Sequence, residues 1–430
     1  MKIVYLITGS GNSFYCANCY RDMLYLRALR KVKGVKANAI PMYLPPGPEE
    51  VLNGYDSEVF FGAISMFLRD KVGFFRNMPS FFDKILDSGP LLKIASRMAG
   101  STRSRGYEEL TLDMIGGGKA FRDEEVDRLV KHLQEGGKPD IIHLSNALIA
   151  GIAKHIKKRM DVKIVCSILN EDDWIEEMED PYREKAWKMI AAEGKNIDGF
   201  VTPSNYYMQL FISKTGIPDN KIHIIPMGYE PDYSPKKEKD IHPPSIGFFN
   251  RVSYNNGFDK IVDSFINLKV KNLIPDLTLN VGGGYTNDDR PFILSQIKKI
   301  KEHGFKKHVR IFPDFMGNKK REFFNSVDII SVPVNKYDGY GLYILEANYA
   351  GIPVVQPATG AFPEILNATG GGIIYSPDTV EELSSGLLSL LTDPKKAHEM
   401  GERGKEQVRS ELSLDNMAGN LSAFYNQLFL

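Results

Sequence analysis

Short runs of apolar residues recur along the whole chain and alternate with segments of helical pattern. The runs lie at 2–8, 36–42, 140–145, 163–169, 198–203, 221–227, 245–250, 277–283, 309–313, 328–333, 353–357 and 371–375. Most of them are continuous in Val, Ile and Leu, which is typical of parallel strands that helices cover on both faces. Strand and helix alternating over this length predict βαβ units, and therefore an α/β fold.

The alternation is interrupted once, where the segment 228–244 reads GYEPDYSPKKEKDIHPP. Its prolines, its run of charges and its lack of hydrophobic periodicity predict a linker. With 430 residues the chain is also too long for one ordinary core. We therefore expect a first doubly wound domain over 1–228, a linker over 229–244 and a second doubly wound domain over 245–410. Since no strand follows the last helix, 411–430, we expect it to pack back on the first domain.

The segment 59–106 does not follow the strand–helix alternation. It contains seven phenylalanines and eight Lys or Arg residues against three Asp residues. Three interpretations stay open: a helical subdomain with a phenylalanine core, a hydrophobic lid over a long acceptor, or a contact with an anionic lipid surface, which would be the inner face of a membrane.

Composition excludes some classes of function. Lys plus Arg and Asp plus Glu both number 54, so bulk charge does not favour nucleic-acid binding. Three cysteines cannot form a disulfide framework, and no signal peptide or membrane-spanning apolar run is visible. We expect a cytoplasmic protein, with the 59–106 segment as its one candidate for peripheral membrane contact.

The stretch 7–22, ITGSGNSFYCANCYRD, follows the first strand and fits several sites. It could be a phosphate-binding loop, a redox motif, half of a zinc site or a turn. A dinucleotide fingerprint would need a third glycine, where Phe14 stands. A thiol oxidoreductase would use Cys16 and Cys19 at a helix start. A zinc site would need two more ligands, and no second Cys-x-x-Cys or pair of His residues is present.

The segment 335–366, NKYDGYGLYILEANYAGIPVVQPATGAFPEIL, carries the most information. A glycine-bearing loop leads into a helix that begins near Gly341, and free amides at a helix N-terminus favour an anion. Two carboxylates, Asp338 and Glu346, flank this position and can accept hydrogen bonds from hydroxyl groups. The pattern therefore predicts a ligand in which a phosphate is joined to sugars.

This segment resembles the retaining glycosyltransferases of family 4, which have the GT-B fold of two Rossmann-like domains facing each other across a cleft. Four further stretches support the resemblance: GFFNRVSYNNGFDKIVDSF (247–265), VGGGYTND (281–288), VTPSNYY (201–207) and KIHIIPMGYE (221–230). The resemblance implies a nucleoside-diphosphate sugar as donor and a hydroxyl group of a glycan, lipid or small molecule as acceptor.

The resemblance also implies roles for individual residues. Glu346 would hold the ribose hydroxyls, Asp338 the donor sugar and Arg251 the diphosphate, where a guanidinium fork suits two phosphate oxygens. The nucleobase would lie near 311–315. The other donor-binding candidates are the amides of Tyr340, Gly341, Leu342 and Tyr343, together with Gly9, Ser10, Gly11 and Asn12 after the first strand, Ser204 and Asn256. In this fold Cys16 and Cys19 are expected to be packed thiols near the cleft, without a catalytic role.

The chain departs from the family at three places. Asp338 stands where the family usually has Glu, and Asn256 stands where it usually has Lys, which removes one cation from the diphosphate. Lys260 is a possible substitute for that cation. Where many members have His, this chain has Asn170, Glu171, Asp172 and Asp173. The carboxylates either orient an acceptor hydroxyl or a cation, or cap the next helix.

His143 and Asn146 lie at the end of a strand, where open α/β sheets bind ligands. We expect Asn146 to lie on the acceptor side. The catalytic candidates are His143, Arg251 and Asp338.

The resemblance thus implies a retaining glycosyltransferase. Since no Asp-x-Asp motif follows a suitable strand, we expect it to need no metal or other cofactor. The alternative within the same fold is a sugar-nucleotide-binding protein with weak or no catalysis, which Asn256 favours. An NAD-dependent or thiol oxidoreductase is the more distant alternative.

Overall fold

The structure is a computed structural model of the chain, and it describes residues 1–8, 15–43, 55–56, 59–61, 104–231, 233, 242–314 and 316–430. Gly9, Ser10, Gly11 and Asn12 lie outside these ranges, as do Phe315, most of the segment 59–106 and most of the predicted linker. By their internal contacts the residues form two compact units: Met1–Asn12, Asn18–Pro226 and Met417–Leu430 make the first, Ser13–Ala17 and Met227–Asn416 the second.

The first unit contains a parallel six-stranded sheet in the order β2-β1-β3-β4-β5-β6. Its strands are β1 (Lys2–Ile7), β2 (Lys36–Pro41), β3 (Ile141–Leu144), β4 (Lys163–Ser167), β5 (Gly199–Thr202) and β6 (Ile222–Ile224). Its helices are α1 (Ala17–Lys31), α6 (Glu108–Gly116), α7 (Asp123–Glu135), α8 (Ile152–Lys157), α9 (Glu171–Ile175), α10 (Tyr182–Glu193) and α11 (Asn205–Thr215), with short 3₁₀ turns at Ala147–Ile149, Gly194–Asn196 and Asp219–Lys221.

The second unit repeats this architecture with a parallel sheet in the order β12-β11-β10-β7-β8-β9. Its strands are β7 (Ser245–Phe249), β8 (Thr278–Gly282), β9 (Val309–Ile311), β10 (Ile329–Ile330), β11 (Val354–Pro357) and β12 (Gly372–Tyr375). Its helices are α12 (Phe258–Val270), α13 (Arg290–Glu302), α14 (Gly317–Asn325), α15 (Leu342–Tyr349), α16 (Phe362–Thr369), α17 (Val380–Leu391) and α18 (Pro394–Ser410), with 3₁₀ turns at Asn287–Asp289 and Lys306–His308.

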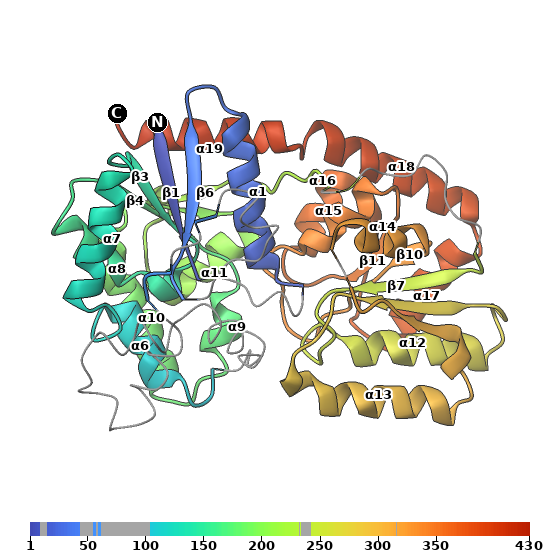
Figure 1. Cartoon of the computed structure of the whole chain (residues 1–430). Helices are drawn as coiled ribbons and strands as arrows, with labels where there is room; N and C mark the ends of the chain where they lie inside the picture. The colour runs from blue at the N-terminus through green and yellow to red at the C-terminus, as the bar shows by residue number, and fades with distance from the viewer. Residues whose placement is uncertain are drawn as a thin grey trace. The chain divides into compact units, whose positions relative to one another are not determined.

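In the second unit, helices cover both faces of the sheet. Helices α12, α13 and α17 pack together on one side, and α15, α16 and α18 pack together on the other (Figure 1). Between these layers every residue of β7 and β11 is buried, and in the first unit every residue of β3 and β5 is buried. The continuous apolar runs therefore do form strands that are covered on both faces, which confirms the predicted doubly wound α/β fold.

The last helix, α19 (Leu414–Gln427), belongs from Met417 onward to the first unit. Its Tyr425 hydroxyl lies 2.7 Å from the Tyr5 hydroxyl on β1. Its Phe424 ring packs against the His223 ring on β6 with 4.3 Å between the ring centroids. A β-carbon added to Gly199 on β5 would lie 2.8 Å from the Phe424 ring. The helix thus covers the first sheet at several strands.

Two phenylalanines of the aromatic segment are described, and both belong to the core. Phe60 is 1% exposed and lies under the Arg128 guanidinium, and Phe61 is fully buried with its ring centroid 5.3 Å from that of Phe121. For these two residues the structure agrees with the interpretation of a phenylalanine core. The other five lie outside the described residues.

Candidate functional site

The predicted donor-binding residues of the second unit gather where the strand order of its sheet reverses. The chain runs outward from β7 through β8 to β9, then returns to add β10, β11 and β12 on the other side of β7. Open α/β sheets bind ligands at the carboxyl ends of the two strands at such a reversal. The loop after β7 carries Arg251 and Asn256, and the loop after β10 carries Asp338 and leads into α15.

Two glycines let neighbouring loops pack backbone to backbone. Gly257 ends the β7 loop with φ +74°, and a β-carbon there would lie 1.9 Å from the Pro333 carbonyl oxygen in the β10 loop. Gly360, in the loop after β11 with φ +58°, faces the backbone of Asp338 in the same way, with 2.4 Å to its carbonyl oxygen. Only glycine fits such positions, so the Arg251 loop is placed against the β10 loop at Gly257, and the Asp338 loop is placed against the β11 loop at Gly360.

The Arg251 guanidinium is held by a carboxylate that the sequence analysis missed. Its Nε and Nη2 each donate to an oxygen of Asp289, both at 2.8 Å, and Thr286 donates to Asp289 from its amide and its hydroxyl. Burial alone would raise the pKa of Asp289, but the Arg251 and Thr286 contacts outweigh it and lower that pKa. Asp289 therefore stays ionised and fixes the fork of Arg251. The Thr-x-x-Asp capping box at 286–289 was the available signal.

Asn256 holds the loop rather than supplying a charge. Its side-chain amide donates to the Arg251 carbonyl oxygen at 2.8 Å. Lys260, the candidate substitute for the missing cation, donates to Asp378 at 2.7 Å and to the Val334 carbonyl oxygen at 3.1 Å. Its ammonium group is therefore ion-paired, as the Arg251 guanidinium is, and the substitution of Lys260 for the missing cation stays a prediction.

Asp338 caps the loop that leads into α15. Its Oδ1 accepts hydrogen bonds from the amides of Tyr340 at 2.9 Å and Gly341 at 3.0 Å. Two of the four amides expected to face the diphosphate are thus already occupied by Asp338. The amides of Leu342 and Tyr343 belong to the first turn of α15, where the helix itself supplies no carbonyl partner. The rings of Tyr340 and Tyr343 are buried.

Glu346 has no solvent-exposed surface, so it is not part of a solvated helix face. Its Oε1 accepts a hydrogen bond from the Lys320 ammonium at 2.7 Å, and its Oε2 accepts one from the Tyr15 hydroxyl at 2.6 Å. Lys320 is also fully buried. Neither Lys320 nor Tyr15 was expected at the site, because no motif marks them.

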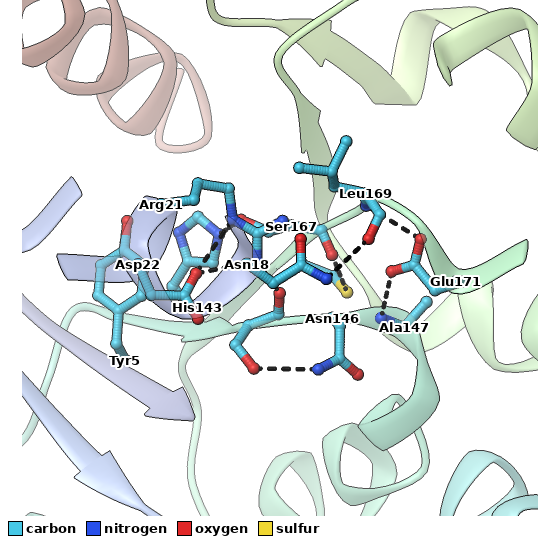
Figure 2. Close-up of polar contacts among 12 residues, drawn as sticks. Tyr5, Asn18, Arg21, Asp22, His143, Asn146, Ala147, Ser167, Leu169 and Glu171 are labelled. Carbon is cyan, nitrogen blue, oxygen red and sulfur yellow. Dashed lines mark hydrogen bonds and ion pairs between the residues drawn. The ribbon is translucent and has the colours of Figure 1, made fainter. Parts of the chain in front are cut away.

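His143 is a core residue of the first unit, which corrects the prediction that it is catalytic. It is fully buried, its Nδ1 lies 2.6 Å from the Tyr425 hydroxyl and its Nε2 lies 2.8 Å from the Ser167 hydroxyl. Its ring stacks on that of Tyr5 with a centroid distance of 4.3 Å. Figure 2 shows Tyr5, His143 and Ser167. Burial lowers its pKa well below the usual value, so it stays neutral. Both ring nitrogens are used inside the core.

Glu171 also has a structural role, which bears on the two interpretations of the 170–172 stretch. The side chain is 2% exposed, and its carboxylate accepts hydrogen bonds from the amides of Ala147 and Leu169 (Figure 2). It also accepts one from the Tyr207 hydroxyl at 2.6 Å. Burial raises its pKa despite these donors. Glu171 ties the ends of β3 and β4 together, and this favours the structural over the acceptor-orienting interpretation for that residue.

The remaining acceptor-side candidates lie around the same strand ends. Asn146 is half-buried, and its Oδ1 caps the following turn by accepting from the Leu148 amide at 3.0 Å. Asn170 adopts a left-handed conformation, with φ 61°, immediately before α9, and Asp172 lies in the first turn of that helix. These positions are those of helix-start residues.

Ser204 is a buried helix cap, which corrects its assignment to the donor site. It is fully buried, and its hydroxyl accepts a hydrogen bond from the Tyr207 amide at 3.1 Å at the start of α11. The side chain therefore serves α11. The sequence VTPSNYY contained this signal, because Ser is among the most favoured N-cap residues.

Cys16 and Cys19 are joined by a disulfide bond at the start of α1, whereas Cys166 is free and buried. The prediction that the first two are packed thiols is therefore wrong. The bond joins Cys16, the residue immediately before α1, to Cys19 in the first turn of that helix. A thiolate zinc site at this pair is not compatible with the bonded state.

The described residues contain neither a candidate membrane span nor a candidate metal cluster. No helix among them combines the length and apolarity needed to cross a membrane. Nor does that part of the chain bring together three or more His, Cys, Asp or Glu side chains in a group that could hold a metal ion.

Comparison with known families agrees with this arrangement. Residues 230–407 match the family model described as glycosyl transferases group 1, and residues 117–233 match the model for glycosyltransferase family 4. Together the two matches span both units. The chain belongs to the GT-B glycosyltransferases of the family 4 type. The predicted family is thereby confirmed.

Curated relatives of this glycosyltransferase are distant. Over 143 residues it is 31% identical to a trehalose synthase of Rubrobacter xylanophilus, covering 33% of this chain and 34% of the relative. Over 266 residues it is 23% identical to a GDP-mannose-dependent alpha-(1-6)-phosphatidylinositol monomannoside mannosyltransferase of Mycobacterium tuberculosis, covering 56% of this chain and 66% of the relative. The chain thus matches from a third to two thirds of the length of these relatives.

Solved structures share its fold over nearly the whole chain. HepE of Anabaena, in complex with UDP and glucose, has a TM-score of 0.70 at 14% identity, with 99% of each chain covered. The sucrose-phosphate synthase of Thermosynechococcus elongatus has a TM-score of 0.68 at 15% identity, covering 100% of this chain and 99% of the other. At these identities the similarity shows the GT-B fold.

Proposed function

We propose that this protein transfers a sugar from a nucleoside-diphosphate donor to a hydroxyl acceptor, with retention of the anomeric configuration. The observation that carries the proposal is the set of groups at the carboxyl ends of β7 and β10. It combines the fixed Arg251 fork, the first turn of α15 and the buried carboxylate of Glu346. A cation and a helix N-terminus suit a diphosphate, and a carboxylate suits sugar hydroxyls.

In the proposed reaction the bond between the anomeric carbon and the diphosphate oxygen breaks. The acceptor oxygen bonds to that carbon from the same face, and its proton passes to the departing diphosphate. The protein's contribution is to position both substrates and to stabilise the charge of the leaving group, which is often the largest catalytic contribution. Arg251 and the first turn of α15 are the groups that would do so.

The names of the relatives narrow the donors worth testing. The mycobacterial relative is GDP-mannose-dependent, and the Anabaena structure contains UDP. A test therefore compares UDP, GDP and ADP by thermal shift and then their sugars in transfer assays. We expect one nucleotide to raise the stability of the folded protein by about 2.7 kcal/mol at about one hundred times its Kd. Failure of all three to bind would contradict the proposal.

A sugar-nucleotide-binding protein without turnover is the second candidate, and Asn256 favours it. The structure shows Asn256 holding the Arg251 loop where the family resemblance places a lysine. Binding of one nucleotide sugar without transfer or hydrolysis, across several sugar acceptors, would support this candidate over the first.

We propose that transfer needs no metal ion, because Arg251 and the start of α15 supply positive charge for the diphosphate. Transfer rates measured with excess EDTA should equal those without it. The control is the same assay after Mg²⁺ is restored, which should leave the rate unchanged. A rate that falls with EDTA and returns with Mg²⁺ would overturn metal independence.

The acceptor and the cellular location stay predictions. A lipid-linked acceptor, and peripheral contact of the segment 59–106 with an anionic membrane surface, rest on the sequence pattern of that segment. A vesicle co-sedimentation assay with full-length protein and with a 67–100 deletion would test the contact.

A further inference from the structure

Glu346 carries its negative charge where solvent does not reach it, and a second buried charge neutralises it. Glu346 and Lys320 are both fully buried, and their side chains form an ion pair at 2.7 Å. A buried ion pair is costly to form and rarely adds net stability over apolar packing. We therefore look for a role of the Lys320–Glu346 ion pair other than stabilising the fold.

Lys320 lies on the buried face of α14, where an apolar residue is expected. Phe323 and Phe324, three and four residues further on, are buried with it on the inner face of the helix. Lys319, the preceding residue, pairs with Glu322 on the exposed face. Lys320 thus stands at an inward position where an apolar residue would ordinarily pack, and its ammonium group ends on Glu346.

The second carboxylate oxygen of Glu346 accepts a hydrogen bond from a hydroxyl group. The Tyr15 hydroxyl donates to Oε2 at 2.6 Å, while the Tyr15 amide donates to the Gly283 carbonyl oxygen at 2.7 Å. The Tyr15 ring packs edge-on against Phe249, with 5.3 Å between centroids. By its contacts Tyr15 belongs to the second unit. A hydroxyl group of a sugar would make the same kind of bond to the same oxygen.

We propose that Lys320 is a positioning residue of the donor site, which fixes Oε1 of Glu346 and leaves Oε2 to a donor hydroxyl whose place the Tyr15 hydroxyl fills. The inference rests on the proposed function, because it requires a nucleotide donor. Lys320 acts through Glu346. The Tyr15 hydroxyl competes with the donor hydroxyl for Oε2 of Glu346.

Lys320 also determines the charge state of Glu346. A buried carboxyl without an opposite charge nearby titrates at a higher pH than usual, since burial disfavours the ion. The titratable groups that contact this carboxyl include Lys320 from α14 and Tyr15. Four charged residues of α18, which packs on α15, make contacts elsewhere: Glu402 and Lys405 at Gly351, Arg403 at Gly370 and Arg409 over the Tyr349 ring.

The first test measures binding of UDP and of GDP by calorimetry to wild type and Lys320→Met, at about pH 6 and about pH 8. For the better nucleotide we expect Lys320→Met to bind about 10-fold more weakly at the lower pH than at the higher, because Glu346 becomes protonated there. The matched control, Lys154→Met, removes a lysine–glutamate pair of the first unit and should follow wild type at both pH values.

The double variant Lys320→Met/Glu346→Gln identifies the titrating group. It carries no ionisable side chain at either position, so its binding should change with pH no more than that of wild type. A pH dependence in Lys320→Met that persists in the double variant would overturn the proposal, as would a Lys320→Met protein whose binding follows wild type at both pH values.

Tyr15→Phe tests the competition without removing a charge. Loss of the hydroxyl should make the same nucleotide bind about 3- to 10-fold more tightly, since one hydrogen bond no longer has to be broken. Unchanged or weaker binding would overturn the role given to Tyr15. If wild type binds neither UDP nor GDP, the proposed donor site fails together with this inference; if wild type binds and the variants behave like it, the inference alone fails.

Discussion

Replacement of Arg251 by methionine is expected to lower kcat/KM for transfer by about 100- to 1000-fold, the loss typical of removing one group that stabilises charge in the transition state. The guanidinium is held by Asp289 through two hydrogen bonds of 2.8 Å, so its position does not depend on the donor. The loss should fall mainly on kcat, because the charge on the diphosphate grows as the sugar departs.

The matched control is Arg290→Met, at the next residue after Asp289. Arg290 is exposed at the start of α13, and the same substitution there should leave kcat/KM within about 2-fold of wild type, as surface substitutions usually do. Asp289→Asn should fall between the two, since it keeps the shape of the fork's partner but removes its charge. A fully active Arg251→Met enzyme would exclude Arg251 from the reaction.

Gly257→Ala is expected to destabilise the protein by about 3 kcal/mol, measured as a lower urea midpoint. The added methyl group would lie 1.9 Å from the Pro333 carbonyl oxygen, and the backbone there has φ +74°, which disfavours any side chain. Because the strain falls on the contact between the loops after β7 and β10, nucleotide binding should weaken as well.

Gly304→Ala separates the steric cost from the backbone cost. Gly304 has a similar φ of +79° in the same unit, but a β-carbon there has no atom within 4 Å. This variant should therefore lose only about 1 kcal/mol, from the left-handed conformation alone. Equal losses at the two positions would show that the loop contact at Gly257 contributes nothing.

The local sequence pattern was enough to predict the strands. It was not enough to predict the roles of polar residues at the strand ends. The apolar runs at 141–144 and 245–249 became fully buried strands because continuous apolar character has few other solutions in a soluble chain. His143 and Ser204 were assigned to the site because both lie at strand ends. Their side chains turn into the core and onto a helix start instead, which depends on the packing of Tyr425 and Tyr207.

Partners distant in sequence were the part that could not be predicted. Asp289 lies 38 residues from Arg251, Lys320 lies 26 from Glu346 and Tyr15 lies 331 from it. The first two contacts join loops or helices that follow different strands of the second sheet, and the third joins a residue after β1 to α15. No local spacing encodes such a pairing.

By itself the sequence predicted two doubly wound sheets, and its resemblance to the family 4 glycosyltransferases implied the family and the loops after β7 and β10 as the candidate site. The sheets could be predicted because hydrophobic periodicity is a local property of one element, and the resemblance rests on short motifs that are local in the same way. The tertiary structure decided which charges neutralise one another: Arg251 with Asp289, Glu346 with Lys320, and Lys260 with Asp378. Charge neutralisation depends on distances in space of a few ångströms, and only the packed sheet brings these side chains that close.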